Sequence, residues 1–68
     1  MQLIIPPLPI PSLIGTFKTL GDLGPAYEVV DALRLAADGD WIMRIRILTT
    51  GEEVEYRYSC VLDDPLAT

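Results

Sequence analysis

The chain contains no histidine and a single cysteine, Cys60. Histidine is the commonest general base and metal ligand, so its absence removes Ser-His and Cys-His nucleophile pairs. One cysteine cannot form an internal disulfide, and a small chain without disulfides is typical of a reducing, cytosolic compartment. We therefore predict a non-enzymatic cytoplasmic protein with no catalytic residues, no metal ligands and no cofactor.

Basic residues are few. Five Lys and Arg stand against ten Asp and Glu, which gives a net charge of −5. Binding to a phosphate backbone needs clustered Lys and Arg, so we predict no nucleic-acid partner. The acidic balance is compatible with a basic protein partner or with plain solubility.

Long uninterrupted apolar runs are also missing. Prolines interrupt the run Leu3-Ile4-Ile5 almost at once, and no stretch approaches the roughly 18 apolar residues of a spanning helix. We predict no membrane span. Yet half of the 68 residues are apolar, and a chain of this size buries only about 60% of its unfolded surface. The excess apolar surface is expected to meet a second copy, another protein or a lipid surface.

The strongest local pattern is a β-hairpin from Trp41 to Tyr58. Strand side chains alternate between two faces, so a turn at Thr50-Gly51 sorts the residues by polarity. The apolar face pairs Ile47 with Val54, Ile45 with Tyr56 and Met43 with Tyr58. The other face pairs Leu48 with Glu53, Arg46 with Glu55 and Arg44 with Arg57. A one-residue slip would scramble both faces.

Residues 1–13 form an extended, proline-rich arm with no charge. Pro6, Pro7, Pro9 and Pro11 exclude a helix or a central strand and favour polyproline II. Disordered tails are normally polar, so we expect this arm to dock on its own domain or on another chain. The residues predicted to bind a partner are Ile4, Ile5, Leu8, Ile10 and Trp41.

The stretch 26–37 can be read in two ways. As a helix it would have Pro25 at its first position and Gly39 beyond its end. As a strand, Tyr27–Val30 is rich in β-favouring residues, and Asp38-Gly39 would turn the chain toward Trp41. We favour the strand, with residues 31–37 as an irregular extension or a helical turn.

Two shorter elements complete the domain, residues 14–68. Residues 14–20 are a strand candidate with Phe17 as its inward anchor. Residues 59–64 could form one helical turn, with Val61 and Leu62 against the sheet. We predict a mainly β fold: a small antiparallel β-meander of three or four strands, an SH3-like half-barrel in its curled form, with the N-terminal arm and a short C-terminal helical turn. The alternative is an α+β fold with a helix at 25–37.

The acidic residues favour structural roles over chemistry. Glu52, Glu53 and Glu55 lie near Arg44, Arg46 and Arg57 in the predicted hairpin, which would neutralise them. Asp63-Asp64-Pro65 is typical of a solvated cap, and Asp22, Asp38 and Asp40 lie beside glycines, where they stabilise turns. Cys60 has no neighbour that would lower its pKa, so we interpret it as a small buried apolar residue.

Several segments together carry a resemblance: Gly15-Thr16-Phe17, Leu23-Gly24-Pro25-Ala26-Tyr27-Glu28-Val29, Arg44-Ile45-Arg46, Thr50-Gly51-Glu52-Glu53, Tyr56 and Asp64-Pro65. In these the chain resembles a family of small uncharacterised bacterial proteins over residues 14–67, with the proline-rich arm outside the similarity. The resemblance implies a prokaryotic, cytosolic protein of unknown function and no catalytic assignment.

Two hypotheses about function follow. The first is a non-enzymatic protein–protein interaction module, an antitoxin-like or inhibitor-like partner of a more basic protein. It predicts that deleting residues 1–12 abolishes partner binding and leaves a folded domain. The second is a structural, self-assembling subunit, a homodimer or higher homo-oligomer, with the arm and Trp41 at the contact.

Overall fold

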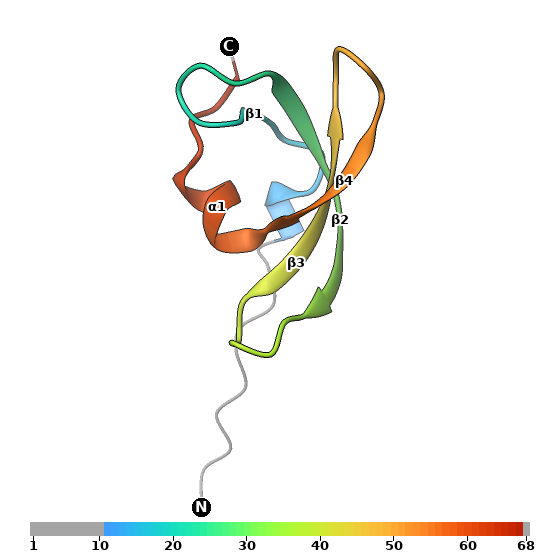
Figure 1. The fold of residues 1–68 in the computed structure, drawn as a ribbon, viewed down its shortest axis with the longest axis vertical. Helices are drawn as coiled ribbons and strands as arrows, with labels where there is room; N and C mark the ends of the chain where they lie inside the picture. Colours follow the sequence, from blue (N-terminus) through green and yellow to red (C-terminus); the bar gives the residue numbers. More distant parts are fainter. Residues whose placement is uncertain (1–10, 68) are drawn as a thin grey trace, which may run out of the picture.

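The computed structural model describes residues 11–67 as one antiparallel sheet with a short helix at its end (Figure 1). In chain order the elements are the 3-10 helix η1 (Pro11–Leu13), β1 (Phe17–Thr19), β2 (Ala26–Leu35), β3 (Trp41–Ile47), β4 (Glu53–Arg57) and α1 (Tyr58–Asp63). The strand order in the sheet is β1-β2-β3-β4, with every neighbouring pair antiparallel. The predicted meander and its C-terminal helical turn are confirmed, and the alternative helix at 25–37 is wrong.

Strand β2 forms because its alternating side chains fit a two-faced sheet. Tyr27 and Val29 point inward and are fully buried, which a helical stripe through the same residues would not achieve. Pairing with β3 is irregular between Val29 and Asp31 and between Ala32 and Arg34. Such bulges bend a strand and increase its twist, so residues 31–35 are the irregular strand extension, not a helical turn.

The hairpin of β3 and β4 keeps its predicted faces but not its predicted partners. The observed pairs are Ile45 with Val54, Met43 with Tyr56, Arg46 with Glu53, and Arg44 with Glu55. One strand is shifted by two residues along the other relative to the predicted register, because the connection spans residues 48–52. There the Gly51 N–H donates to the Ile47 carbonyl at 2.7 Å, and Gly51 adopts φ +73°. A shift of two preserves side-chain parity, so the apolar and charged faces survive.

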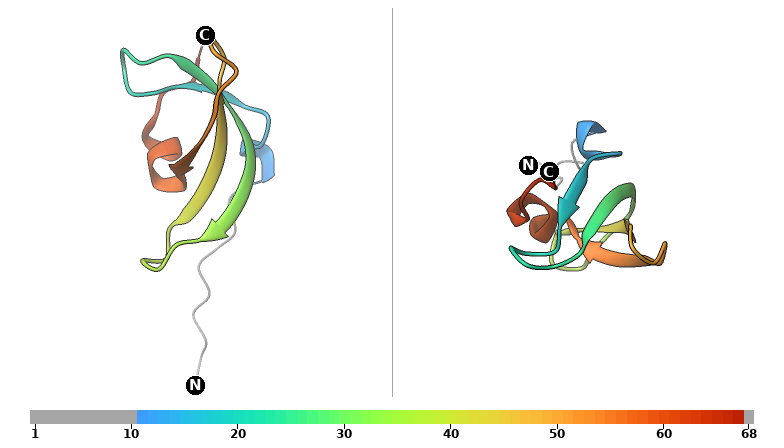
Figure 2. Two further views of the ribbon diagram at one scale, coloured as in Figure 1. Left: turned by 45° about the vertical axis from the view of Figure 1, so that its right-hand side comes forward. Right: turned by 90° about the horizontal axis from the view of Figure 1, so that it is seen from above.

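The outer edge of β1 is covered by the end of the chain. Lys18 bridges to Leu66, Thr19 N–H donates to the Pro65 carbonyl at 3.0 Å, and Ala67 N–H donates to the Phe17 carbonyl at 3.0 Å. Helix α1 lies between β4 and this bridging segment, on the concave side of the sheet (Figure 2). The curled sheet, closed on one side by α1 and residues 65–67, agrees with the SH3-like half-barrel form of the meander.

The core of the described chain is small. Five side chains are fully buried, and they come from β2, β3 and α1: Tyr27, Val29, Met43, Ile45 and Val61. The sheet therefore packs its concave face on a single helical turn.

Two inward positions were predicted wrongly. Phe17 is 47% exposed, whereas its neighbour Lys18 is only 7% exposed and donates to the Val61 carbonyl. Leu62 is 50% exposed although Val61 is buried. Adjacent residues of a helix point about 100° apart, so one turn cannot aim both side chains at the same sheet.

Candidate functional site

Of the residues predicted to bind a partner, only Trp41 lies within the described chain. Ile4, Ile5, Leu8 and Ile10 lie outside it. Trp41 opens β3 opposite Leu35 of β2, is half-buried and packs against the core. This side chain thus contributes to the packing around the core, and the predicted partner contact stays a prediction.

Asp64 connects three segments that are distant in sequence. Its Oδ2 atom accepts hydrogen bonds from the Tyr27 hydroxyl at 2.7 Å and the Tyr56 hydroxyl at 2.9 Å. Its Oδ1 atom accepts from the Gly21 N–H at 3.0 Å, in the β1–β2 turn. The prediction of a merely solvated cap is wrong for Asp64. The carboxylate fastens the end of α1 to β2, β4 and that turn.

This cluster shifts the pKa of its members in the directions that hold it together. Burial raises the pKa of Asp64, but the hydrogen bonds from Tyr27, Gly21 and Tyr56 and the charge of Lys18 lower it by more, so the net pKa lies below the ordinary value. Burial, followed by the hydrogen bond to Asp64, raises the pKa of Tyr56 to about 12. The same causes raise the pKa of Tyr27 well above its ordinary range. The carboxylate stays charged and both phenols stay protonated near neutral pH.

Lys18 completes the connection from the other side. Its Nζ atom donates to the Val61 carbonyl at 2.7 Å and to the Asp64 carbonyl at 3.2 Å. These carbonyls lie at the C-terminal end of α1, where a cation is favourable. The ammonium group is therefore turned inward and adds little positive charge to the surface.

The convex face of the sheet carries cross-strand ion pairs. Glu53 contacts Arg44 at 3.9 Å and Arg46 at 3.5 Å, as predicted. Each arginine also reaches a carboxylate of β2, Arg44 to Asp31 at 3.4 Å and Arg46 to Glu28 at 3.3 Å.

Glu55 takes a partner that was not predicted. Arg34 of β2 donates to both of its carboxylate oxygens, at 2.7 and 3.1 Å. This hydrogen bonding lowers the pKa of Glu55 below its ordinary value. The two-residue shift in register explains the change, because it moves Arg46 from Glu55 to Glu53.

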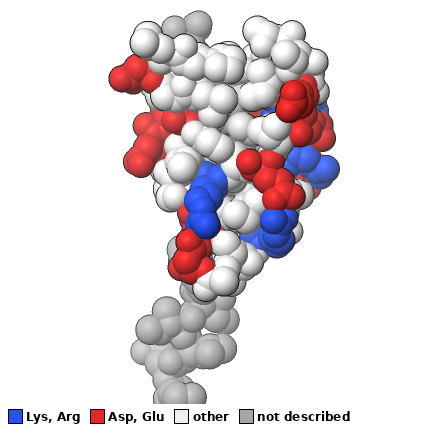
Figure 3. Space-filling view, viewed as in Figure 1, with Lys and Arg blue, Asp and Glu red and all other residues white. Residues whose placement is uncertain are grey.

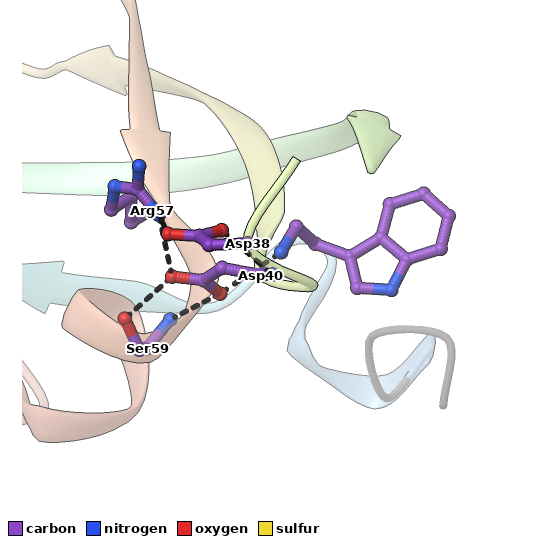
Figure 4. Close-up of polar contacts among 5 residues, drawn as sticks. Asp38, Asp40, Arg57 and Ser59 are labelled. Carbon is purple, nitrogen blue, oxygen red and sulfur yellow. Dashed lines mark hydrogen bonds and ion pairs between the residues drawn. The ribbon is translucent and has the colours of Figure 1, made fainter. Parts of the chain in front are cut away.

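Asp38 and Asp40 do more than shape the β2–β3 turn (Figure 4). Arg57 contacts Asp38 at 2.6 Å and Asp40 at 3.4 Å. Asp40 also accepts from the Ser59 hydroxyl at 2.7 Å and from the Ser59 N–H at 3.3 Å. Helix α1 has no side-chain cap from its own N-cap residue, so Asp40 supplies one from a distant turn. The Ser59 hydrogen bond is the main cause of a lowered pKa at Asp40.

A surface beside this framework combines exposed apolar and acidic side chains. We call it the acidic–apolar face and define it by Asp22, Leu23, Leu62, Asp63 and Leu66. Leu23 is 99% exposed, Leu62 50% and Leu66 66%. The hydrogen bond from Gly21 to Asp64 holds the β1–β2 turn against the end of α1, and the bridge to Lys18 places Leu66 beside β1. Over that turn and the end of α1, acidic groups stand apart from basic ones, whereas the two signs alternate over the hairpin (Figure 3).

Residues 4–68 match a family described as a family of unknown function (DUF5397). The chain belongs to this family. An uncharacterized protein of Haemophilus influenzae (strain ATCC 51907 / DSM 11121 / KW20 / Rd) is 38% identical over 53 residues, which are 78% of this chain and 84% of the relative.

The family match confirms the resemblance to small uncharacterised bacterial proteins and corrects its extent. The similarity was predicted to cover residues 14–67 and to leave out the proline-rich arm. The DUF5397 match begins at residue 4, so most of the arm is part of the sequence that defines the family.

The acidic–apolar face was not predicted from the sequence. Leu23 lies in a Gly-rich turn and Leu66 follows Pro65, and each resembles an ordinary isolated apolar residue. These positions come together only in the folded chain, through the contact of Gly21 with Asp64 and the hydrogen bonds of residues 65–67 to β1. Within residues 11–67 no group of three His, Cys, Asp or Glu side chains is placed to hold a metal ion, and no helix is long and apolar enough to cross a membrane.

Proposed function

We propose that this member of DUF5397 is a non-enzymatic protein–protein interaction module that binds a more basic protein through the acidic–apolar face. The observation that carries the proposal is a fully exposed leucine, Leu23, flanked by Asp22, in a turn that the hydrogen bond from Gly21 to Asp64 connects to the end of α1. An exposed apolar side chain in an acidic setting suits a partner that presents apolar and basic side chains together.

The distribution of charge supports a basic partner. All five basic residues are engaged: Lys18 with backbone carbonyls, and Arg34, Arg44, Arg46 and Arg57 each with at least one carboxylate. Four acids of the described chain form no ion pair: Asp22, Glu52, Asp63 and Asp64. Asp22 and Asp63 lie on the acidic–apolar face, and Asp64 lies beside it. The uncompensated negative charge therefore gathers where the exposed leucines are.

The arm remains part of this proposal. Ile4, Ile5, Leu8 and Ile10 carry no nearby charge, and the family match includes them. We propose that these residues and Trp41 contribute apolar contact to the same partner.

The experiment compares three full-length chains as bait for proteins of the source cell. They are the wild type, Leu23→Ser/Leu66→Ser on the acidic–apolar face, and Leu33→Ser/Leu35→Ser as a matched control on the far half of β2. We expect one basic protein to be captured by the wild type and the control, to be lost from the face variant, and to be released by moderate salt. Equal capture by the face variant and the control would overturn the proposal.

A second candidate function is a structural self-assembling subunit. The observation that favours it is the outer edge of β4, which the rest of the described chain leaves uncovered.

A further inference from the structure

The two edge strands of the sheet differ in whether their outer backbone groups are hydrogen-bonded. The outer edge of β1 is hydrogen-bonded to residues 65–67, but the outer edge of β4 is open. Ile47 N–H donates to the Glu52 carbonyl at 2.8 Å, so the pairs Ile45–Val54 and Met43–Tyr56 are the hydrogen-bonded pairs of the ladder. The backbone groups of the alternate residues 53, 55 and 57 then point away from β3. As the N-cap residue of α1, Arg57 uses its carbonyl for the first hydrogen bond of the helix. The other outward groups of these three residues have no backbone hydrogen-bond partner within residues 11–67.

A hollow lies along the C-terminal half of this edge. It has a volume of about 290 Å³ and is lined by Ile42 of β3, Glu55, Tyr56 and Arg57 of β4, and Cys60 of α1. Its surface is almost wholly apolar. An open strand edge beside an apolar hollow is the arrangement that accepts an added strand, because the edge supplies hydrogen bonds and the hollow receives a side chain.

The sequence of β4 is complementary to itself when read in the opposite direction. If two copies pair antiparallel with Glu55 at the two-fold axis, Glu53 lies opposite Arg57 of the second copy, and Val54 lies opposite Tyr56 of the second copy. The outward backbone groups of Glu53 and Glu55 and the N–H of Arg57 also face the second copy in this register. On one face acid thus meets base on both sides of the axis, where Glu55 lies opposite Glu55, and on the other face apolar meets apolar.

The same sequence of β4 disfavours a parallel pairing of two copies. A parallel, in-register pair would set Glu53 against Glu53 and Arg57 against Arg57, and like charges directly opposite each other are unfavourable. At the two-fold axis of the antiparallel pair the two Glu55 side chains meet, but each is already bound by both guanidinium nitrogens of its own Arg34. The charged edge therefore discourages general aggregation while permitting one specific partner.

We propose that two copies of this chain join edge to edge along β4, centred on Glu55, so that Val54 of each copy enters the hollow between Tyr56 and Cys60 of the other. The two sheets then form one continuous sheet. This contact is independent of the proposed function, because the acidic–apolar face lies at the β1–β2 turn and the end of α1.

The first test removes one outward N–H group. In the full-length chain, Glu55→Pro lacks that donor, and an edge strand tolerates proline where the N–H faces outward. Glu55→Ala is the matched control, because it loses the same side chain and keeps the N–H. By sedimentation equilibrium we expect the wild type and Glu55→Ala to form dimers and Glu55→Pro to dimerise about tenfold or more weakly. A wild type that stays monomeric up to millimolar concentration, or a Glu55→Pro chain that dimerises as tightly as Glu55→Ala, would overturn the proposal.

A second test does not depend on how well β4 accepts proline. In Glu55→Cys/Cys60→Ser the two new thiols face each other across the two-fold axis at a Cα separation of about 5.5 Å, which suits a disulfide. The control, Glu52→Cys/Cys60→Ser, places its thiol in the hairpin loop, away from that axis. Mild oxidation should link the residue-55 thiols into a dimer much faster than the residue-52 thiols. Equal rates for the two variants would contradict the β4 contact and favour a dimer built elsewhere, such as through the arm.

Discussion

Asp64 hydrogen-bonds to more separate elements of the described chain than a neighbouring residue in sequence could connect. Its side chain accepts from Tyr27 of β2, Tyr56 of β4 and Gly21 of the β1–β2 turn, while its backbone carbonyl accepts from Lys18 of β1. Only five side chains of the described chain are fully buried, so apolar burial alone contributes little stability to this fold. A satisfied, partly buried carboxylate of this kind stabilises the fold through charge-assisted hydrogen bonds.

Replacing Asp64 should therefore destabilise the chain. Asp64→Asn keeps one acceptor oxygen but removes the charge and one of the two carboxylate acceptors. We expect the free energy of unfolding to fall by about 1–3 kcal/mol in urea titration. The adjacent, exposed Asp63 is the matched control, and Asp63→Asn should stay within about 0.5 kcal/mol of the wild type. Equal effects of the two substitutions would show that Asp64 has no special role.

The same residue should make stability depend on pH. Because the pKa of Asp64 is lower in the folded chain than in the unfolded one, the folded state binds fewer protons. The stabilisation is fully present above the unfolded pKa of about 3.9 and is lost as pH falls toward the folded value. The difference in stability between the wild type and Asp64→Asn should thus be largest near neutral pH and should shrink below about pH 4. Urea titrations at a series of pH values measure this, and a difference that grows on acidification would contradict it.

At the residue scale the sequence predicted little of this cluster. Alternation placed Tyr27, Met43 and Ile45 on one face, but a strand as short as β1 gives too few positions to decide between Phe17 and Lys18. Lys18 faces inward because its ammonium group donates to backbone carbonyls at the end of α1. Lys18 and Val61 are 43 positions apart in sequence, so no local pattern indicates this contact. Asp64 likewise accepts hydrogen bonds from Gly21, Tyr27 and Tyr56 only because the chain folds these distant residues against the end of α1.

At the scale of secondary-structure elements, the hairpin shows that periodicity determines which face of a strand is buried but not which residues pair. The alternation of apolar and charged residues determined which side of β3 and β4 is buried. It did not determine the partners, because any shift by two residues preserves the pattern. The connection through residues 48–52, with Gly51 at φ +73°, set the actual register.

Gly51 should accordingly be sensitive to substitution for backbone reasons alone. A Cβ atom built on Gly51 would have no atom within 4 Å outside its chain neighbours, so no clash arises. The left-handed conformation nevertheless costs a non-glycine residue roughly 1–2 kcal/mol. We expect Gly51→Ala to lower the free energy of unfolding by about that amount and Gly51→Asn by less, since asparagine tolerates this region. Thermal unfolding followed by circular dichroism would measure both, and an unchanged Gly51→Ala chain would contradict the assigned turn.

Helix α1 depends on a residue from another turn. Asp40 accepts from the Ser59 N–H and hydroxyl, and Arg57 holds both Asp38 and Asp40 nearby. The sequence correctly placed Asp38 and Asp40 at a turn beside Gly39. It gave no sign that this turn caps a helix 19 positions further along, because capping was expected from a neighbour in sequence.

For the molecule as a whole, exposed large apolar side chains in the described chain are spread over β1, β2, α1 and the segments outside the strands and helices. They are Ile14, Phe17, Leu23, Leu33, Leu35, Leu48, Leu62 and Leu66. Composition alone predicted that such surface exists. Its location follows from the way α1 and residues 65–67 close the sheet. The open edge of β4 is a property of the whole topology as well, since it is the last strand of the meander.

The proline-rich arm, residues 1–13, is predicted to contact another molecule. In the full-length chain, changing Ile4, Ile5, Leu8 and Ile10 to Ser should weaken binding to the captured partner. The far-ultraviolet circular dichroism should change little, since the described core comes from β2, β3 and α1. Affinity measured by surface plasmon resonance tests this, and binding as strong as that of the wild type would remove the arm from the proposed interface.

The central claim is that the acidic–apolar face binds a basic partner, and its most direct test is calorimetric titration of the purified partner into three full-length chains. We predict that Leu33→Ser/Leu35→Ser binds like the wild type, that Leu23→Ser/Leu66→Ser binds about tenfold or more weakly, and that raising the salt concentration weakens wild-type binding. Undiminished affinity of the Leu23→Ser/Leu66→Ser chain, unaffected by salt, would contradict the claim.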